Sequence, residues 1–417
     1  MAFPWERIEE GLRRHFHSTA TLGPGRSSET ASSGQCPWAH VALIDCDWRD
    51  GRPKDELPER VAVKVVRGGE GISGVPDELR TSLPALRAQL FNTFIGNCHR
   101  AEALLYEDSK SWPKNDFIPR YLFSQGLIED NTVPIDGILV MERVDDVFSR
   151  KFDENLTFQQ AQQVARAIGK MQGVCHVRKL CDDTLTFDRS LSKVFWTIND
   201  CESFATLNCQ LIDLDERDIL SPILDKFADH FGLFYGSEKV DTIHKQLGIH
   251  PVICHGDIWQ RNILLDRGTG NVRAIVDWKY AHSGSPAEDL ARLVLTSLSP
   301  ADRRNHQREL IGEQFVGLLE GLDGAPPPYN IDQLHHNYRL ILPYVGLFII
   351  PVSKTLFDER RAVELTPTEL RLRNAVAIGR LSRMYEELVA VGEGEQKECS
   401  HKPPPPPEGS KRSRKEK

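Results

Sequence analysis

PVICHGDIWQRNILLD (residues 251–266) and NVRAIVDW (residues 271–278) are the two segments that decide the fold expected of this chain. Each combines a short apolar run typical of a β-strand with polar residues, whereas the surrounding sequence has helical periodicity. Irregular segments between regular elements often carry binding and catalytic residues. We therefore expect the functional site here, at the polar residues His255, Gly256, Asp257, Asn262 and Asp277.

The spacing of these polar residues resembles the catalytic and metal-binding loops of the protein-kinase-like superfamily. Protein kinases place an aspartate and an asparagine at the separation of Asp257 and Asn262, and a metal-binding aspartate in the next strand–loop unit, as at Asp277. The resemblance implies that Asp257 orients or deprotonates an attacking hydroxyl, and that Asn262 and Asp277 bind Mg²⁺ against the phosphates of ATP. It also implies an α+β, protein-kinase-like two-lobed fold.

The neighbouring residues indicate a branch of that superfamily that acts on small molecules. His-Gly-Asp replaces the His-Arg-Asp of protein kinases, Trp278 and Lys279 replace Phe-Gly, and no Ala-Pro-Glu follows at activation-segment distance. HGDIWQRNILL and AIVDWKYAHSGSPAEDLARL are most similar to the choline/ecdysteroid kinase-like proteins of nematodes and insects, within the aminoglycoside phosphotransferase group. This resemblance implies transfer of the γ-phosphate of ATP to a hydroxyl of a choline-, ethanolamine- or steroid-like alcohol.

Lys64 and Glu102 are expected to form an ion pair. RVAVKVV (residues 60–66) alternates as a half-buried strand should, and places Lys64 on a mostly apolar face. From Pro84 to about Lys110 the apolar residues follow the stripe of a long amphipathic helix, and Glu102 lies on that stripe, whereas Glu107 lies off it. Two inward charges are costly unless they pair. The resemblance makes them catalytic: Lys64, held by Glu102, grips the α- and β-phosphates.

The remaining nucleotide contacts are expected from a hinge and a glycine loop. GILVMERV corresponds to the family's interlobe hinge, so that Met141, Glu142, Arg143 and Val144 would lie against the nucleotide. Ser33 and Gly34 lie in the candidate phosphate-covering loop, but Cys36 stands where relatives usually carry another glycine. This departure motivates an alternative function, a catalytically weak or inactive nucleotide-binding pseudokinase of the same fold.

Two residues are expected to support the catalytic loop. By composition alone His255 could be a general base or a metal ligand, but the resemblance implies that it braces the loop. Asp289, in PAEDLA, resembles a helix-borne carboxylate that steadies the loop from below. For both residues the alternative is a polar group that only satisfies the core.

The chain is expected to divide into a nucleotide-binding lobe (1–144), a catalytic and substrate lobe (145–391) and a Pro-rich, basic, disordered tail (392–417). The first lobe combines a small antiparallel sheet with one long helix. The second lobe is larger and helix-rich, and its first helix is capped by Thr157.

Composition narrows the class of partner. A chain of 417 residues with 40% hydrophobic and 27% charged residues can bury a large core. Its formal net charge of -8 argues against nucleic acid or anionic lipid as a partner. The nine cysteines lack paired spacing, which favours free thiols and a cytoplasmic location over a disulfide frame or a zinc site at Cys175, His176, Cys181, Cys201 and Cys209.

The sequence predicts no membrane insertion and leaves the acceptor open. The beginning of the chain lacks the apolar core of a secretory signal. The most apolar stretch, Leu340–Val352, is shorter than the ~20 residues of a membrane crossing, and Pro343 and Pro351 are expected to break it. No oligomeric state is indicated. Candidate acceptor-binding residues, most of them better explained as core, are Trp196, Asp200, Glu202, Tyr280, Tyr338 and Tyr344.

Overall fold

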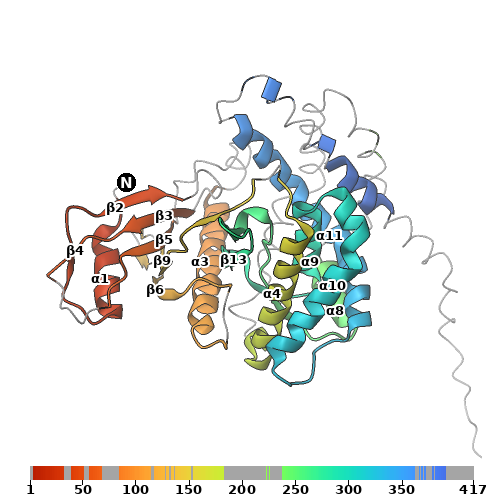
Figure 1. Cartoon of the computed structure of the whole chain (residues 1–417), viewed down its shortest axis with the longest axis horizontal. Helices are drawn as coiled ribbons and strands as arrows, with labels where there is room; N and C mark the ends of the chain where they lie inside the picture. The colour runs from red at the N-terminus through yellow and green to blue at the C-terminus, as the bar shows by residue number, and fades with distance from the viewer. Residues whose placement is uncertain are drawn as a thin grey trace, which may run out of the picture.

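The computed structural model describes residues 3–31, 39–50, 56–67, 84–113, 117–126, 128–130, 133–135, 137–151, 154–182, 237–361 and 381–390, with 222, 225, 366, 368–369, 371 and 378–379. Within these residues the predicted α+β, two-lobed fold is confirmed. A sheet with two helices forms one part, and a larger helical part follows it along the chain (Figure 1). The tail from 392 onward lies outside the described residues.

The N-terminal part is built on an antiparallel five-stranded sheet with the strand order β2-β3-β5-β9-β6. The strands are β2 (Ser27–Thr30), β3 (Ala39–Asp45), β5 (Arg60–Val66), β9 (Gly137–Glu142) and β6 (Tyr121–Gln125). Short pairs lie outside this sheet, formed by β1 (Thr21–Leu22) with β4 (Trp48–Arg49) and by β7 (Ile128–Asp130) with β8 (Val133–Ile135). The register pairs Lys64 with Val41 on one side and with Leu139 on the other.

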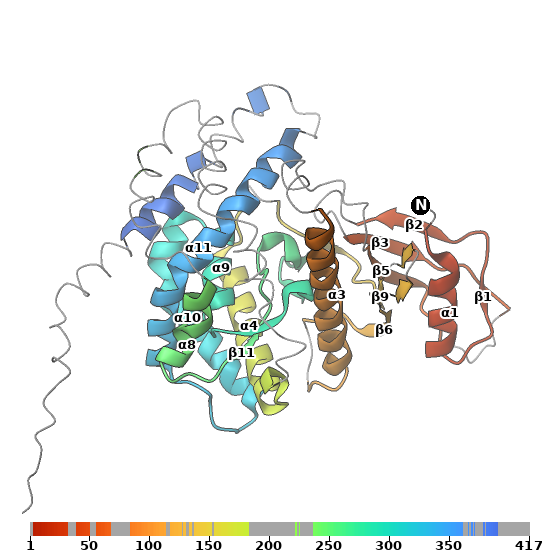
Figure 2. The same ribbon diagram turned by 180° about the vertical axis from the view of Figure 1, so that it is seen from behind.

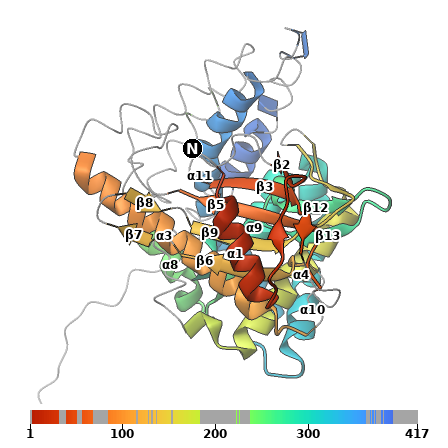
Figure 3. The ribbon, with the colours of Figure 1, turned by 90° about the vertical axis from the view of Figure 1, so that its left-hand side faces the viewer.

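The central strand β5 is buried on both faces, so the prediction of a half-buried strand was wrong. Helix α1 (Trp5–His15) covers one face, where Ile8 and Leu12 pack with Val63. Figure 3 shows α1 lying across the sheet. Helix α3 (Pro84–Ser109) covers the other face and lies between the sheet and the helical part (Figures 1 and 2). The sequence pattern of one strand cannot show that a second helix returns to its outer face.

The helical part begins with α4 (Phe158–Val177), which Thr157 caps as predicted. The Thr157 hydroxyl accepts from the Gln160 amide, and the Gln160 side chain accepts from the Thr157 amide. The chain has already entered this part at β10 (Val147–Phe148), which pairs with β12. The later helices are α8 (Ser237–Gln246), α9 (Glu288–Ser297), α10 (Pro300–Leu322) and α11 (Ile331–Arg361).

Helices α4 and α10 touch through glycines on both sides. A Cβ added at Gly169 or Gly173 would collide with backbone atoms of α10, and one added at Gly317 or Gly321 would collide with backbone carbonyls of α4. Because no side chains separate them there, the two helices approach each other at backbone distance. Both helices also contact α9, and α4 contacts the strands that flank the polar loops at 255–262 and 276–281.

Helix α11 runs from Ile331 to Arg361 through both Pro343 and Pro351, so the expected break was wrong. A proline removes one backbone hydrogen bond from a helix, but packing on both sides of it can keep the helix continuous. Among the described residues, no helix has the length and apolarity needed to cross a membrane.

Residues 251–266 and 271–278 form short strands around polar loops. β11 (Val252–Cys254) pairs with β14 (His282–Gly284), whereas β12 (Ile263–Asp266) pairs with β13 (Val272–Ile275) and β10. Single 3₁₀ turns lie at η1 (Leu180–Asp182), η2 (Gln260–Asn262) and η3 (Trp278–Tyr280). The loop between β11 and η2 carries His255, Gly256 and Asp257.

Candidate active site

Lys64 links the sheet to the catalytic segments. Its Nζ lies 2.6 Å from Glu102 Oε2 on α3 and 2.5 Å from Asp277 Oδ1 after β13. The predicted Lys64–Glu102 pair is therefore present, and Glu107 is exposed, away from it. Burial works to lower the pKa of Lys64, but the carboxylates of Asp277 and Glu102 outweigh it and raise that pKa. Lys64 is thus held as a buried cation between two carboxylates.

Asp277 sits at a turn and carries two cationic partners. Its φ of 68° lies in the left-handed region, which an aspartate tolerates better than most residues. Besides Lys64, the Nζ of Lys279 contacts its Oδ2. Burial works to raise the pKa of Asp277, but Lys279 and Lys64 lower it far below the usual range. The carboxylate is therefore ionised and in a position that attracts positive charge.

Asp257 lies beside Asp277, shares Lys279 with it and has Arg292 as a second cationic partner. Arg292 donates from Nη2 to Asp257 Oδ1 at 2.6 Å, and Lys279 Nζ lies 3.7 Å from Asp257 Oδ2. Asn262 donates from Nδ2 to the Asp257 carbonyl at 2.9 Å and, more weakly, to Oδ2 at 3.3 Å. Because Nδ2 of Asn262 is used in these bonds to Asp257, the Asn262 amide oxygen is the atom that could bind a cation.

These oxygens fit the ligand preference of Mg²⁺, which takes carboxylate and amide oxygens together with phosphates. The structural observation behind this fit is that two ammonium groups, from Lys64 and Lys279, converge on the Asp277 carboxylate. Asp277 and the amide oxygen of Asn262 are the residues that would hold the ion.

The back of the catalytic loop is held by Asp289 and His255. The Asp289 carboxylate accepts from the amide of His255 at 2.6 Å and from that of Gly256 at 2.9 Å. Burial raises the pKa of Asp289 to about 6, despite those two amide donors. His255 Nε2 lies 3.1 Å from the Val276 carbonyl, and its Nδ1 accepts from the Asp257 amide, which fixes the tautomer. Burial lowers the pKa of His255 to about 4, so the ring is neutral near pH 7.

Gly256 is required by the shape of this loop. Its φ is 79°, and a Cβ added there would lie 2.5 Å from the Tyr280 carbonyl oxygen. A side chain at 256 would therefore be both strained and in collision. The glycine between His255 and Asp257 lets the loop pass close under η3.

The expected hinge residues do not all face the same way. Met141 pairs with Ala62 and so shares the sheet face of Lys64, whereas Glu142 pairs with Val61 on the opposite face. The Glu142 amide donates to the Arg120 carbonyl, and Arg143 pairs with Asp145. Val144 is half-buried. Ser33 and Gly34 lie outside the described residues.

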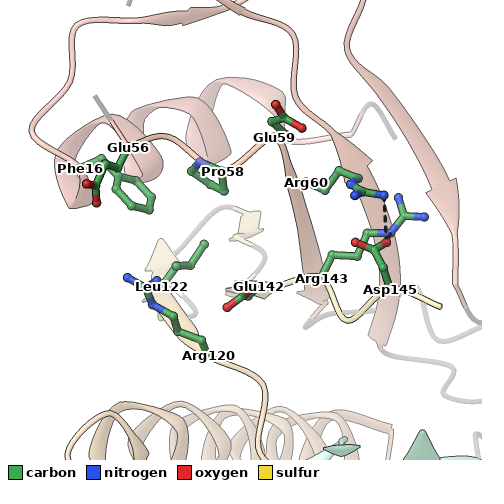
Figure 4. Close-up of a pocket in the computed structure, with 10 residues that line it drawn as sticks. All are labelled: Phe16, Glu56, Pro58, Glu59, Arg60, Arg120, Leu122, Glu142, Arg143 and Asp145. Carbon is green, nitrogen blue, oxygen red and sulfur yellow. Dashed lines mark ion pairs between the residues drawn. The ribbon is translucent and has the colours of Figure 1, made fainter. Parts of the chain in front are cut away.

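A pocket of about 350 Å³ lies at the end of the sheet, apart from the site (Figure 4). Glu142 and Arg143 line it, but Lys64, Asp257 and Asp277 do not. Its lining mixes acidic and basic side chains, among them Arg60, Arg120 and Asp145.

Sequence reasoning missed two site residues, Lys279 and Arg292. In the sequence, Lys279 stands out only because Trp278 and Lys279 replace the Phe-Gly of protein kinases. Arg292 stands out only as part of the segment AIVDWKYAHSGSPAEDLARL, which carries the family resemblance. A signal was present, because Arg292 lies three residues after Asp289, on the same face of a helix. The direction in which the Lys279 side chain points depends on the left-handed turn at Asp277, and the spacing of apolar residues in the sequence does not predict such a turn.

Of the acceptor candidates, Tyr338 and Tyr344 belong to the main hydrophobic core. Tyr280 is half-buried and stacks on Phe94 with ring centroids 6.3 Å apart. Trp196, Asp200 and Glu202 lie outside the described residues. The five described cysteines, at 46, 98, 175, 181 and 254, form no disulfide with one another.

Comparison with solved structures gives matches that cover most of each chain, with low sequence identity and low TM-scores. A chain from Ralstonia eutropha, described as "a putative aminoglycoside phosphotransferase", aligns over 94% of this chain and 99% of its own, with 14% identity and a TM-score of 0.45. Plasmodium vivax ethanolamine kinase aligns over 85% of this chain and 82% of its own, with 10% identity and a TM-score of 0.39.

Comparison with curated sequences gives two nematode relatives. The chain is 26% identical over 111 residues to the Uncharacterized kinase-like protein D1044.1 of Caenorhabditis elegans, which is 27% of this chain and 29% of that protein. It is 29% identical over 126 residues to the Uncharacterized oxidoreductase dhs-27 of the same species, which is 26% of this chain and 15% of that protein. The match thus spans less than a third of either relative.

One family model covers nearly the whole sequence. Residues 2–395 match DUF1679, a family described as "Uncharacterized oxidoreductase dhs-27". The matched range includes both parts of the fold and every site residue described above. The chain belongs to the DUF1679 family.

Proposed function

We propose that this chain is an ATP- and Mg²⁺-dependent phosphotransferase that transfers the γ-phosphate to a hydroxyl group of a small molecule. The observation that carries the proposal is the meeting of Lys64 and Glu102, from the sheet and α3, with Asp277, which lies beside Asp257. These residues come from separate parts of the sequence and have no core-packing reason to gather four charges. The name of one relative, the Uncharacterized kinase-like protein D1044.1, agrees with this function.

Asp257 is proposed to position and deprotonate the acceptor hydroxyl. Arg292, 2.6 Å from Oδ1, fixes the direction of the carboxylate. The other oxygen, Oδ2, accepts the weaker bond from Asn262 at 3.3 Å and would also accept the hydroxyl hydrogen of the acceptor. Proton transfer to a positioned carboxylate is the usual way in which this chemistry activates an alcohol.

Lys64 is proposed to hold the α- and β-phosphates of the nucleotide. Glu102 is more deeply buried than Asp277, with side-chain exposures of 1% and 25%. A nucleotide entering from the open side would therefore replace Asp277 as a partner of Lys64 and leave the Glu102 pair intact. Asp277 and Asn262 would then hold Mg²⁺, which supplies charge neutralisation at the phosphates.

Lys279 is proposed to replace the catalytic-loop lysine of protein kinases. That lysine would stand two residues after Asp257, where this chain has Trp259. Lys279 instead reaches the same carboxylate from the metal loop, 3.7 Å from Asp257 Oδ2. Its ammonium group lies between Asp257 and Asp277, where negative charge on the transferred phosphate would pass.

The acceptor is proposed to be an alcohol of the choline, ethanolamine or steroid kind. The proposal follows from the resemblance of the HGDIWQRNILL segment. Of the aromatic candidates that the structure describes, Tyr280 is half-buried, whereas Tyr338 and Tyr344 belong to the main hydrophobic core.

The test is a screen of the purified chain with γ-labelled ATP against pooled metabolites and generic protein substrates. We expect label in a small alcohol and none in protein, with loss of the product when Mg²⁺ is chelated or when Asp277 is changed to Asn. Thermal melting with ATP and Mg²⁺ is the companion measurement, because a ligand that binds the folded state raises Tm. A Tm shift without a labelled product would favour the inactive pseudokinase. The absence of both the Tm shift and the labelled product would overturn both functions.

A further inference from the structure

A second cluster of metal-binding residue types lies behind the catalytic loop. It consists of Cys254 at the end of β11, His282 at the start of β14 and Glu288 at the start of α9. Cys254 and His282 are direct partners in the strand register. One ligand atom from each residue, the sulfur, a ring nitrogen and a carboxylate oxygen, lies within 4.8 Å of the others.

The tautomer of His282 directs an unprotonated nitrogen into this cluster. Its Nδ1 lies 2.9 Å from the Tyr280 carbonyl, which only accepts, so Nδ1 carries the hydrogen. In the neutral ring Nε2 is then a bare lone pair. Nε2 is buried, has no hydrogen-bond partner and lies 3.3 Å from Glu288 Oε1, another acceptor. Two acceptors face each other, so the contact requires a cation or an added proton between them.

The space around these atoms is kept free by a glycine. A Cβ added at Gly284 would lie 2.8 Å from His282 Nε2 and 3.1 Å from Cys254 Sγ. The buried hydroxyl of Ser285, in the same loop, also has no hydrogen-bond partner. Buried polar atoms without partners commonly mark an ion or water that completes the site.

We propose that Cys254, His282 and Glu288 bind one zinc ion. A thiolate, an imidazole nitrogen and a carboxylate are the ligand types that Zn²⁺ takes in proteins, and the thiolate disfavours Mg²⁺ and Ca²⁺. Binding replaces the thiol hydrogen, which leaves to solvent as a proton, and releases the bond from Cys254 Sγ to the Ser285 carbonyl at 3.2 Å. The two negative ligands balance the charge of the ion. A backbone carbonyl bound to Nδ1–H is the usual way to orient a metal-binding histidine.

Zinc at this position would join the three elements that hold the catalytic loop. β11 leads directly into His255, and Glu288 precedes Asp289, the residue that accepts the two loop amides. The ion would fix this frame without touching the atoms that transfer phosphate. It would therefore raise the stability of the folded chain whether or not the chain is a kinase.

The experiment measures zinc bound by the full chain after chelator treatment and dialysis against Zn²⁺. We expect one tightly bound equivalent, which is lost in Cys254→Ser and in His282→Gln. It should be retained in Cys46→Ser, a control that removes a free thiol in the N-terminal part, and in Asp277→Asn, a control for metal bound at the candidate active site. Zn²⁺ should raise the Tm of the chains that bind it.

Co²⁺ provides a readout that needs no variant to fold. Bound to a thiolate, it gives a sulfur-to-cobalt absorption band in the near ultraviolet, which the control variants should share with the parent chain. The proposal is overturned if the parent chain binds no equivalent, or if Cys254→Ser and His282→Gln bind as much as the parent does. In that case a proton on Nε2 or a water molecule fills the cluster.

Discussion

The two sides of the catalytic loop are held by different kinds of contact. On the front, charged side chains hold one another: Asp257 is bound by Arg292, and Asp277 by Lys64 and Lys279. On the back, Asp289 accepts from two backbone amides, and the His255 ring is locked to a carbonyl and an amide. Under the proposed function, phosphate or magnesium would replace some of the front contacts, whereas the back contacts cannot be replaced without moving the chain. The front is thus arranged for ligands, and the back for loop shape.

One helix serves both sides. Asp289 and Arg292 lie three residues apart on α9, and the first holds the loop backbone while the second holds the Asp257 side chain. Front and back are therefore aligned by a single rigid element. This suggests that substitutions on the front will change activity and substitutions on the back will change stability.

The largest expected effect is that of Asp257→Asn on the front. The amide keeps the size of the side chain but cannot take the acceptor proton, so kcat should fall by about 10²- to 10⁴-fold. Steady-state kinetics on the acceptor found by the screen, with circular dichroism and thermal melting, check this prediction. Unfolding of the variant would show that the front is also structural and would break the distinction between the two sides.

Lys279→Gln should have the next largest effect. Loss of the cation near the transferred phosphate should lower kcat by roughly 10²-fold with a smaller change in KM for ATP. The matched control is Lys245→Gln, at an exposed lysine on α8, which should match the parent chain. If Lys279→Gln raises KM and leaves kcat unchanged, Lys279 binds the ground state and the transition state equally and does not stabilise the transition state selectively.

Asp289→Asn tests the back. At either orientation of the new amide, one backbone N–H of the loop loses its acceptor, which should lower the free energy of unfolding by about 1–3 kcal/mol. Urea denaturation measures the change. Asp323→Asn is the control, because Asp323 is exposed and its φ of 47° suits asparagine equally well. Equal stability of the two variants would mean that Asp289 does not brace the loop.

The smallest expected effect is on the pH dependence of stability, and it comes from His99 on α3 in the N-terminal part. Burial, and to a smaller extent Lys64, lower the pKa of His99 below 6.5, and its Nε2 donates to the Gln125 carbonyl at 2.9 Å. As pH falls below 6.5 the unfolded chain takes up the proton first, so the stability present above 6.5 is progressively lost. His99→Gln keeps a donor but does not titrate, so its stability should depend less on pH over that range.

Urea unfolding of the parent chain and of His99→Gln on both sides of pH 6.5 provides the comparison. Identical pH dependence of the two proteins would show that the pKa of His99 does not differ between the folded and unfolded states.

Sequence reasoning succeeded where one periodicity decides the outcome. Lys64 and Glu102 each lie on an apolar face, and their pairing followed from the cost of burying either charge alone. It failed where distant elements decide, as at β5, whose second face is covered by α1, and at α11, which passes through Pro343. Lys279 belongs to the same class, because its direction is set by the left-handed turn at Asp277.

The glycine contact between α4 and α10 has a consequence for how this protein can vary. A methyl group at Gly173 would lie 2.5 Å from the Leu318 carbonyl oxygen, and methyl groups at Gly169, Gly317 and Gly321 would meet backbone in the same way. No change of rotamer on the opposing helix relieves a collision with a carbonyl. In a library of random variants selected only for soluble expression, these four positions should therefore return glycine more often than exposed helical positions do.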